Sequence, residues 1–537
     1  MRTPDRWLAS RWRRGCLAVL AGALPMFAFP APSLWWLAYV ALVPWILLVR
    51  SAPTDRRAAY DGWLGGTGFM LGVHHWLLPN LHVFTFVMAA LLGALWAPWG
   101  LLVRRFLAGA PSGARVAAAL VVVPSGWLAA ELVRSWEALG GPWGLLGSSQ
   151  WQVGPALRLA SVGGVWLLSL LVVAVNVAVA VLVAVDRARV PAVAGLAAVA
   201  AAGSAAWVWA PRPVVDGHAR VAVVQPGYAD AAGSPGRRFA REEALTRRLA
   251  GQDVDLVVWG ESSVGFDLAD RPDLADRIAA LSRTTGADVL VNVDARRSDR
   301  PGIYKSSQLV GPDGPTGDRY DKMRLVPFGE YVPARSVLGW ATSVGEAAGE
   351  DRRRGTRQVV MDVPAGLRDG SGLRIGPMVC FESAFPDLGR RLARDGARVL
   401  IAQSATSTFQ RSWAPAQHAS LAALRAAETG RPMVHATLTG VSAVYGPGGG
   451  RVGPRLGTDA STGAVYEVPL ATGVTPYVRL GDWAVCAALL VLVVAGAADT
   501  VRAVRLRRRG RTGRTGRRGR PAPPARTTRE SPARPAR

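Results

Sequence analysis

Three side chains that can do chemistry stand where predicted strands end. Glu261 follows the run 255–260, Cys380 follows the run 375–379, and Lys322 lies between them along the chain. A thiol is mostly protonated at neutral pH, so a cysteine needs a neighbouring base and cation to become a usable nucleophile. A carboxylate, an ammonium and a thiol together therefore suit nucleophilic catalysis, provided that the fold brings them into contact.

Short β-branched runs alternate with Ala- and Arg-rich stretches between residues 220 and 476, which predicts an α/β layered domain. Residues beyond the carboxyl ends of such strands line the crevice where ligands bind, so the three side chains are expected to meet there. No GxGxxG or P-loop motif follows any of the runs, which leaves nucleotide binding without support. The expected strands are Arg220–Gln225, Asp255–Trp259, Asp288–Val293, Gln308–Val310, Leu373–Val379 and Arg398–Ala402, and the expected helices are Arg237–Ala250, Leu274–Thr285, Pro386–Asp395 and Gln417–Thr429.

Lysine is rare in this chain. Of the 63 lysine and arginine residues, only Lys305 and Lys322 are lysine. A compact ammonium can approach an oxyanion as a point charge, which a planar guanidinium does not reproduce. The rarity favours a chemical role for Lys322, and two lysines retained by chance is the alternative. Structural interpretations also stay open: a cysteine at a strand end is usually a small buried hydrophobe, a glutamate there often caps a helix, and a lysine often lies on the surface.

The N-terminal part of the chain contains repeated apolar segments that are long enough to cross a bilayer. With 537 residues, 50% of them hydrophobic, the chain is too long for one ordinary domain and too apolar for a disordered protein. A helix needs about 20 apolar residues to cross the hydrocarbon core. A cleaved signal peptide is an alternative for the first segment only. The eight expected spans are about 15–31, 33–49, 60–78, 84–103, 116–133, 157–185, 190–210 and 483–498.

Positive charge predicts the orientation of these spans. Arginines precede the first span and occupy alternate loops, which places the N-terminus in the cytoplasm and the α/β domain outside. The net charge of +25 does not indicate nucleic acid, because 14 arginines and one glutamate between Arg502 and Arg537 supply about half of it. We expect this C-terminal tail to be disordered and to face anionic lipid in the cytoplasm.

Two further patterns concern the surroundings of the expected site. The loop after the fifth span reads Gly-Gly-Pro-Trp-Gly-Leu-Leu-Gly-Ser-Ser-Gln from Gly140 to Gln150, and by itself suits a structural anchor at the outer interface better than a substrate contact. Cys16, Cys380 and Cys486 are far apart and lack CxxC spacing, so we expect neither a metal site nor a disulfide framework.

With these residues considered, the sequence resembles the nitrilase superfamily, whose members use a Glu, a Lys and a Cys at three strand ends of an αββα sandwich. It resembles more narrowly the apolipoprotein N-acyltransferases, in which such a domain lies between the seventh and eighth spans. The most specific match is Lys322-Met-Arg-Leu-Val-Pro-Phe-Gly-Glu-Tyr-Val-Pro333. Supporting matches are Pro142-Trp143 through Gln150, Gly430-Arg-Pro432 and the segment 475–482 before the last span.

The resemblance implies a polytopic α-helical membrane protein with an extracytoplasmic α/β nitrilase-like domain. The implied segments are a seven-span transmembrane domain at 1–212, a nitrilase-like catalytic domain at 213–476, an eighth transmembrane helix at 477–500 and a basic disordered cytoplasmic tail at 501–537. The implied location is the plasma membrane, with both termini in the cytoplasm.

The reaction implied by the resemblance transfers an acyl chain from a phospholipid to the α-amino group of a diacylglyceryl-cysteine at the N-terminus of an apolipoprotein, through a cysteine thioester in a ping-pong scheme. A monomer is implied, with no cofactor, no metal and no nucleic acid partner. The implied residues are Glu261 as general base, Lys322 as oxyanion partner, Cys380 as nucleophile, Glu330, Glu382 and Phe381 in support, and Trp143, Gln150 and Tyr331 at the substrates.

The sequence departs from the resemblance near the expected pocket. Gln403-Ser-Ala-Thr-Ser-Thr-Phe409 replaces an Asn-Asp and a Trp, Lys305 stands where Asn is common, Phe381 replaces a Tyr, and no Trp follows Gln225. These differences leave two other functions open. One is a membrane-tethered nitrilase-type amidase that uses water as acceptor, and the other is a non-catalytic scaffold paralogue.

Overall fold

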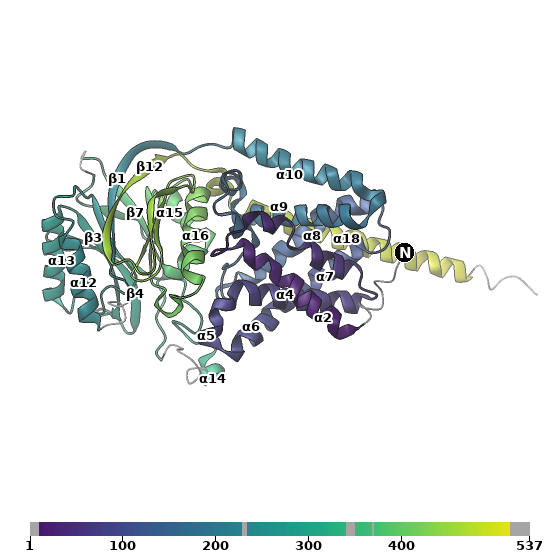
Figure 1. Ribbon diagram of the computed structural model, residues 1–537, viewed down its shortest axis with the longest axis horizontal. Coiled ribbons are helices and arrows are strands. Elements are labelled where there is room, and N and C mark those ends of the chain that lie inside the picture. Colours follow the sequence, from purple (N-terminus) through teal and green to yellow (C-terminus); the bar gives the residue numbers. More distant parts are fainter. Residues whose placement is uncertain (1–9, 228–233, 340–348, 368–369, 516–537) are drawn as a thin grey trace, which may run out of the picture. The chain divides into compact units, whose positions relative to one another are not determined.

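The computed structural model describes residues 10–227, 234–339, 349–367 and 370–515. The chain divides into two units, Met1–Leu489 and Leu490–Arg537. The first unit holds a helical half and a domain of two sheets (Figure 1). In the second unit, the described residues 490–515 belong to the long helix α18, Trp483–Thr515.

Apolar helices make up most of the described chain between residues 10 and 209. Among the described residues, five helical segments are long and apolar enough to cross a membrane, and they correspond to the fourth to eighth expected spans: Val83–Leu107, Gly113–Arg134, Gly154–Ala184, Asp186–Trp209 and Trp483–Arg505. The longer elements of this half are α2 (Arg11–Ala23), α3 (Val43–Arg50), α4 (Asp55–His74), α6 (Val83–Gly93), α7 (Ala97–Leu107), α8 (Gly113–Arg134), α9 (Gly154–Ala184) and α10 (Arg189–Trp209).

The first three expected spans are helical but shorter or more polar. Helix α2 has 13 residues, and the apolar segment Trp35–Arg50 is also short. Helix α4 has 20 residues but contains several glycines and the fully buried Asp61, which pairs with Arg14 at 2.7 Å and Arg57 at 2.8 Å. The number of membrane crossings therefore stays a prediction.

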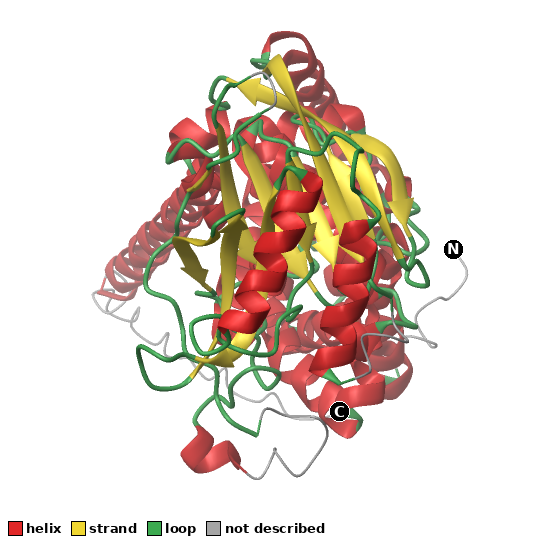
Figure 2. Cartoon of the chain, turned by 90° about the vertical axis from the view of Figure 1, so that its left-hand side faces the viewer, coloured by secondary structure: helices red, strands yellow, loops and turns green. Residues whose placement is uncertain are grey.

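Two six-stranded sheets form the second half of unit one, in the orders β12-β1-β2-β3-β4-β5 and β11-β10-β9-β8-β7-β6 (Figure 2). The first sheet contains β1 (Val214–Gln225), β2 (Leu256–Trp259), β3 (Asp288–Arg296), β4 (Ile303–Gly311), β5 (Gly314–Asp321) and β12 (Thr462–Thr472). The second contains β6 (Met361–Val363), β7 (Leu373–Val379), β8 (Val399–Ser404), β9 (Met433–Thr437), β10 (Ser442–Tyr445) and β11 (Arg451–Leu456). The helices of this domain are α12 (Pro235–Arg247), α13 (Pro272–Thr285), α14 (Arg335–Leu338), α15 (Pro386–Arg394), α16 (Ala414–Thr429) and α17 (Pro476–Leu480).

Alternating side chains explain the layers. On β1, Val221 and Val223 join the core between the two sheets, whereas Ala222 and Val224 join the core beneath α12 and α13. Helices α15 and α16 cover the other sheet (Figure 1). The result is an αββα sandwich, which confirms the predicted fold class and all ten predicted elements, although β5, β6 and β9 to β12 were not predicted.

Helix α9 breaks where the expected sixth span has two adjacent glycines. Gly164 has a φ of +69°, and a Cβ there would lie 2.7 Å from the ring of Tyr477. The break leaves the N–H of Val165 without a helical acceptor, and it donates to Glu428 Oε1 on α16 at 2.8 Å. The sandwich and the helical half are thus joined at the kink by a buried hydrogen bond.

Helix α18 extends further than the sequence suggested. We expected residues 501–537 to be disordered, but residues 501–515 continue α18 as a helix. Arginine is a good helix former, so a basic composition does not by itself end a helix. Residues 516–537 lie outside the described residues.

Candidate active site

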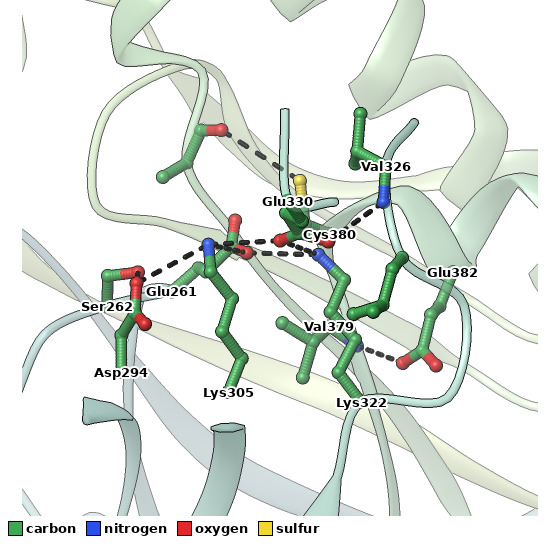
Figure 3. Close-up of polar contacts among 12 residues, drawn as sticks. Glu261, Ser262, Asp294, Lys305, Lys322, Val326, Glu330, Val379, Cys380 and Glu382 are labelled. Atoms are coloured by element: carbon green, nitrogen blue, oxygen red, sulfur yellow. Dashed lines mark hydrogen bonds and ion pairs between the residues drawn. The ribbon is translucent and has the colours of Figure 1, made fainter. Parts of the chain in front are cut away.

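The structure places the three predicted chemical residues at three strand ends and brings them together (Figure 3). Glu261 lies two residues after β2, Lys322 directly after β5, and Cys380 directly after β7. Strands β2 and β5 belong to one sheet and β7 to the other, so the site lies where the two sheets meet at one end of the sandwich. The charges of Glu261 and Lys322 both act on the thiol of Cys380.

Two ammonium groups and two carboxylates form the centre of the site. Lys322 Nζ lies 2.7 Å from Glu330 Oε1 and 3.2 Å from Glu261 Oε1. Lys305 Nζ lies 2.8 Å from Glu261 Oε1, 3.1 Å from Glu330 Oε1 and 3.7 Å from Asp294 Oδ2. The sequence predicted Glu261, Lys322 and Glu330 here, and did not predict Lys305 or Asp294.

Burial and charge act in opposite directions on these groups. Burial alone would raise the pKa of Glu261 and of Glu330, but Lys305 and Lys322 reverse this, holding the pKa of Glu261 below its ordinary value and lowering that of Glu330 to about 2. Burial would lower the pKa of Lys322, but the two glutamates raise it. Both glutamates are therefore ionised and both lysines protonated at neutral pH.

Cys380 occupies a sharp turn. Its φ is +53°, an uncommon value for a residue other than glycine, and it opens the short 3₁₀ helix η9, Cys380–Ala384. Its Sγ donates to the carbonyl of Ala405 at 3.9 Å. Burial and the charge of Glu261 raise the pKa of the thiol to about 12, although Lys322 and Lys305 oppose the rise. The resting site is therefore a neutral thiol beside an ionised base.

Glu382 links the loop after Lys322 to the strand before Cys380. Its Oε1 accepts from the Tyr320 hydroxyl at 2.7 Å and from the N–H groups of Met323 and Arg324 at 2.8 and 3.0 Å. Its Oε2 accepts from the N–H of Val379 at 2.8 Å. This fully buried carboxylate holds both strand ends in fixed positions relative to each other.

The glycine-rich loop predicted as an anchor packs against η9. Gly141 has a φ of +65°, and a Cβ there would lie 2.6 Å from Phe381 and 2.8 Å from Phe385, so only glycine allows this close approach. Trp143, in the same loop, lies 5.2 Å from the His418 ring, measured between ring centroids. Two predicted residues, Phe381 and Trp143, are therefore next to the cysteine turn.

Gln417 joins the loop to a second tryptophan. Its Oε1 accepts from Trp143 Nε1 at 2.9 Å and from Trp76 Nε1 at 3.1 Å. Its neighbour His418 places Nε2 3.0 Å from the carbonyl oxygen of Cys380. Helix α16 thus connects the aromatic residues of the helical half to the backbone of the cysteine turn.

The other two residues predicted at the substrates lie elsewhere. Gln150 is fully buried in the helical half, where its Nε2 donates to the carbonyl of Trp35 at 3.0 Å. Tyr331 is half-buried, with the Arg354 guanidinium carbon 5.1 Å from its ring centroid. The structure therefore gives no direct support to a substrate contact for either residue.

Besides Asp294, sequence reasoning gave no role to four residues of the site and its supports. Lys305 carried a usable signal, since it is one of only two lysines. Gln417 and His418 carried no signal, because their partners are remote in sequence. Glu137 also carried none, yet its Oε1 accepts from the N–H of Leu325 at 2.9 Å and so ties the Lys322 loop to the helical half.

Comparison with known proteins extends these observations over the whole chain. Residues 21–178 match the family model described as the apolipoprotein N-acyltransferase N-terminal domain, and residues 220–473 match the carbon-nitrogen hydrolase model. An apolipoprotein N-acyltransferase of Geobacter metallireducens is 32% identical over 525 residues, which cover 92% of this chain and 96% of that protein. The chain belongs to the apolipoprotein N-acyltransferase family.

A second relative agrees with this assignment. An apolipoprotein N-acyltransferase of Azotobacter vinelandii is 31% identical and covers 89% of this chain and 94% of its own length. Among solved structures, a CN-hydrolase superfamily protein of Xanthomonas campestris is 20% identical, covers 47% of this chain and 90% of its own, and has a TM-score of 0.34.

Proposed function

We propose that the protein transfers an acyl chain from a membrane phospholipid to the α-amino group of the diacylglyceryl-cysteine of an apolipoprotein. The observation that carries the proposal is the meeting of Cys380, Glu261 and Lys322 in one buried cluster, in a chain that belongs to this family. The five long apolar helices suit substrates that are anchored in a bilayer.

In the first half-reaction, Cys380 attacks the carbonyl carbon of a phospholipid ester while Glu261 takes the thiol proton. The carbonyl oxygen becomes an oxyanion, which Lys322 and a backbone N–H beyond Cys380 stabilise, and one such donor is typically worth about 3 kcal/mol. The ester C–O bond then breaks, and the leaving alcohol takes the proton from Glu261. The products are a lysophospholipid and a thioester on Cys380.

In the second half-reaction, the neutral α-amine of the acceptor attacks the thioester carbonyl. Glu261 takes a proton from the attacking nitrogen, and Lys322 again faces the oxyanion. The C–S bond breaks, and the sulfur takes the proton back from Glu261. This sequence forms an amide and regenerates the starting site, so each half-reaction uses the same base.

The supporting residues have distinct roles in this scheme. Glu330 holds Lys322 by the 2.7 Å ion pair, and Glu382 aligns the strand ends. Trp143 and Phe381 form part of an apolar wall next to the cysteine turn, which would exclude water from the thioester. Gln150 and Tyr331 remain candidates for outer contacts with the substrates.

The proposed setting is the plasma membrane, with both termini in the cytoplasm, the sandwich on the extracytoplasmic side and the protein acting as a monomer. The segment boundaries 1–212, 213–476 and 477–500 belong to this proposal. The alternation of arginine-rich and arginine-poor loops supports the orientation.

Mass spectrometry of the full chain in phospholipid vesicles tests the proposal. Incubation with phosphatidylethanolamine should add one acyl mass to Cys380 and release lysophospholipid, and a synthetic diacylglyceryl-cysteine peptide should then discharge the acyl group as an amide. Cys380→Ala should abolish both signals. Rapid hydrolysis with no peptide acylation would instead indicate an amidase-like use of water, and full activity of Cys380→Ala would indicate a scaffold.

A further inference from the structure

The second lysine of the chain lies in direct contact with the proposed base. Lys305 Nζ donates to Glu261 Oε1 at 2.8 Å, closer than the 3.2 Å of Lys322 to the same oxygen. Only 13% of the Lys305 side chain is exposed. A chain with 61 arginines thus places both of its lysines on one carboxylate oxygen.

Three features fix the Lys305 ammonium in this position. In the antiparallel pair of β3 and β4, Lys305 lies opposite Asp294, whose Oδ2 is 3.7 Å from the ammonium. Asp294 is itself held by the Ser262 hydroxyl, which donates at 3.1 Å, and by Arg352 at 3.4 Å. The cation is therefore built into the sheet and does not depend on a flexible loop.

The titratable groups that face Glu261 come from five elements. They are Lys305 on β4, Lys322 after β5, Glu330 in the following loop, Cys380 on η9 and His418 on α16. With one lysine, the two glutamates would share a single positive charge and repel each other. With two lysines, the charges of the two carboxylates are balanced, and both can stay ionised as the pH falls.

We propose that Lys305 is a positioning residue of the reaction, whose fixed positive charge keeps Glu261 in its basic form at acidic pH. The inference rests on the proposed function of Glu261 as the base. A base works only when it is ionised, and a neighbouring cation favours the ionised form of a carboxyl group. Removal of Lys305 should therefore move the acidic limit of the reaction to higher pH.

Water reaches the outer side of the cluster formed by Lys305, Asp294 and Glu261. Asp294 and Arg352 line a surface cavity of about 480 Å³, together with Asp267, Asp270 and Arg296. Protons can therefore equilibrate with the carboxylate cluster from this side without passing the apolar wall that contains Trp143. The acidic limit should accordingly follow the pH of bulk solvent.

The test compares the full chain with Lys305→Asn, Lys305→Arg and Asp294→Asn in phospholipid vesicles. The first readout is the rate at which iodoacetamide alkylates Cys380, followed by mass spectrometry between pH 4 and 8. The second is the rate of acyl-Cys380 formation from phosphatidylethanolamine over the same range. Thermal unfolding of each variant shows whether it is folded.

In each pH profile, the acidic limb is the range in which the rate falls as the pH is lowered. In Lys305→Asn, this limb should move to higher pH by about one unit in both profiles, which is the lower end of the effect of an adjacent opposite charge on a pKa. Lys305→Arg should keep the original limb, and Asp294→Asn, which removes an opposing negative charge, should not move it to higher pH.

A Lys305→Asn profile that is lower at every pH but has an unmoved limb would overturn the inference, because it would indicate a purely structural lysine. If Lys305→Asn does not fold, an upward shift in Asp294→Asn or in Lys305→Arg would overturn it equally. Alkylation needs no lipid, so a moved alkylation limb without any acylation would refute the phospholipid reaction and leave the inference on Lys305 intact.

Discussion

Glu382→Gln should separate the two strand ends that carry Lys322 and Cys380. Glu382 accepts hydrogen bonds from four donors: one hydroxyl and three backbone N–H groups. A carboxylate accepts from all of them, whereas an amide has one accepting oxygen and an NH₂ group that can only donate. Whichever way the amide is turned, at least one buried donor faces another donor.

The expected loss of stability in Glu382→Gln follows from these contacts. The least damaging orientation keeps the amide oxygen at the Oε1 position and turns the NH₂ group toward the N–H of Val379. Loss of one hydrogen bond to a charged acceptor costs about 1.5–3 kcal/mol, and the remaining bonds weaken because the acceptor is neutral. We therefore expect a loss of about 3 kcal/mol, which lowers the Tm by roughly 6–12 °C in a domain of this size.

The same change should reduce activity. The Val379 contact fixes the strand that ends at Cys380, and the bonds from Met323 and Arg324 fix the loop that begins at Lys322. A displacement of about 1 Å between reacting groups can reduce the rate about 100-fold, so kcat/KM should fall by about that factor with little change in KM.

Thermal unfolding and single-turnover acylation of the full chain in vesicles check both numbers. Tyr320→Phe is the matched control, because it removes one donor and leaves the carboxylate with its other three. Tyr320→Phe should lower the free energy of unfolding by only about 1–2 kcal/mol and the acylation rate by less than tenfold. Equal and small effects of Glu382→Gln and Tyr320→Phe would refute the view that Glu382 aligns the strand ends.

Three further changes test other parts of the structure. Glu330→Gln removes the carboxylate 2.7 Å from Lys322 and should lower kcat by about 100-fold or more with KM nearly constant, as measured by steady-state acylation. Gln417→Leu leaves two indole N–H groups without their acceptor; a calorimetric scan should show a loss of about 2–4 kcal/mol, and the KM for phospholipid should rise. Glu428→Gln breaks a buried pair with Arg425 and weakens the contact at the α9 kink, and denaturant unfolding should show a loss of about 3 kcal/mol or more.

The chemical residues were predictable because strand ends can be read from a sequence. Glu261 and Cys380 each end a short apolar run, and both faces of those strands are buried, so the runs are nearly continuous in hydrophobic residues. Lys322 was predictable for a different reason, its rarity among 61 arginines. Local pattern and composition pointed to these three positions, and the resemblance supplied their roles.

The elements that were missed lack such a pattern. Strand β11 is mostly exposed and includes Gly453 and Pro454, residues that are uncommon in strands. Helix α4 was predicted as the third span, but the reason for its glycines was not: they allow direct contact, and a Cβ at Gly68 would lie 1.9 Å from the carbonyl oxygen of Val19. The pairing of β11 and the glycines of α4 both depend on packing against another element, and a short stretch of sequence does not contain that element.

The long-range supports of the site were also beyond prediction from one sequence. Glu137 and Leu325 are 188 positions apart, and Gln417 and Trp143 are 274 apart. Their side chains become partners only because the helical half and the sandwich pack at a particular register. Gln150 is a further example, since its motif position suggested a substrate contact but gave no sign of its hydrogen bond to the carbonyl of Trp35.

The electrostatic state of the site constrains the order of chemical events. The pKa of the Cys380 thiol is about 12, and that of Glu261 lies below its ordinary value, so full proton transfer from sulfur to carboxylate in the resting site is strongly unfavourable. The negative charge becomes stable only when it moves on to a carbonyl oxygen near Lys322. We therefore infer that the thiol proton leaves as the C–S bond forms, so the resting cysteine should react only slowly with unrelated electrophiles. A resting thiolate would react quickly with iodoacetamide at pH 7, and such fast alkylation would contradict this order.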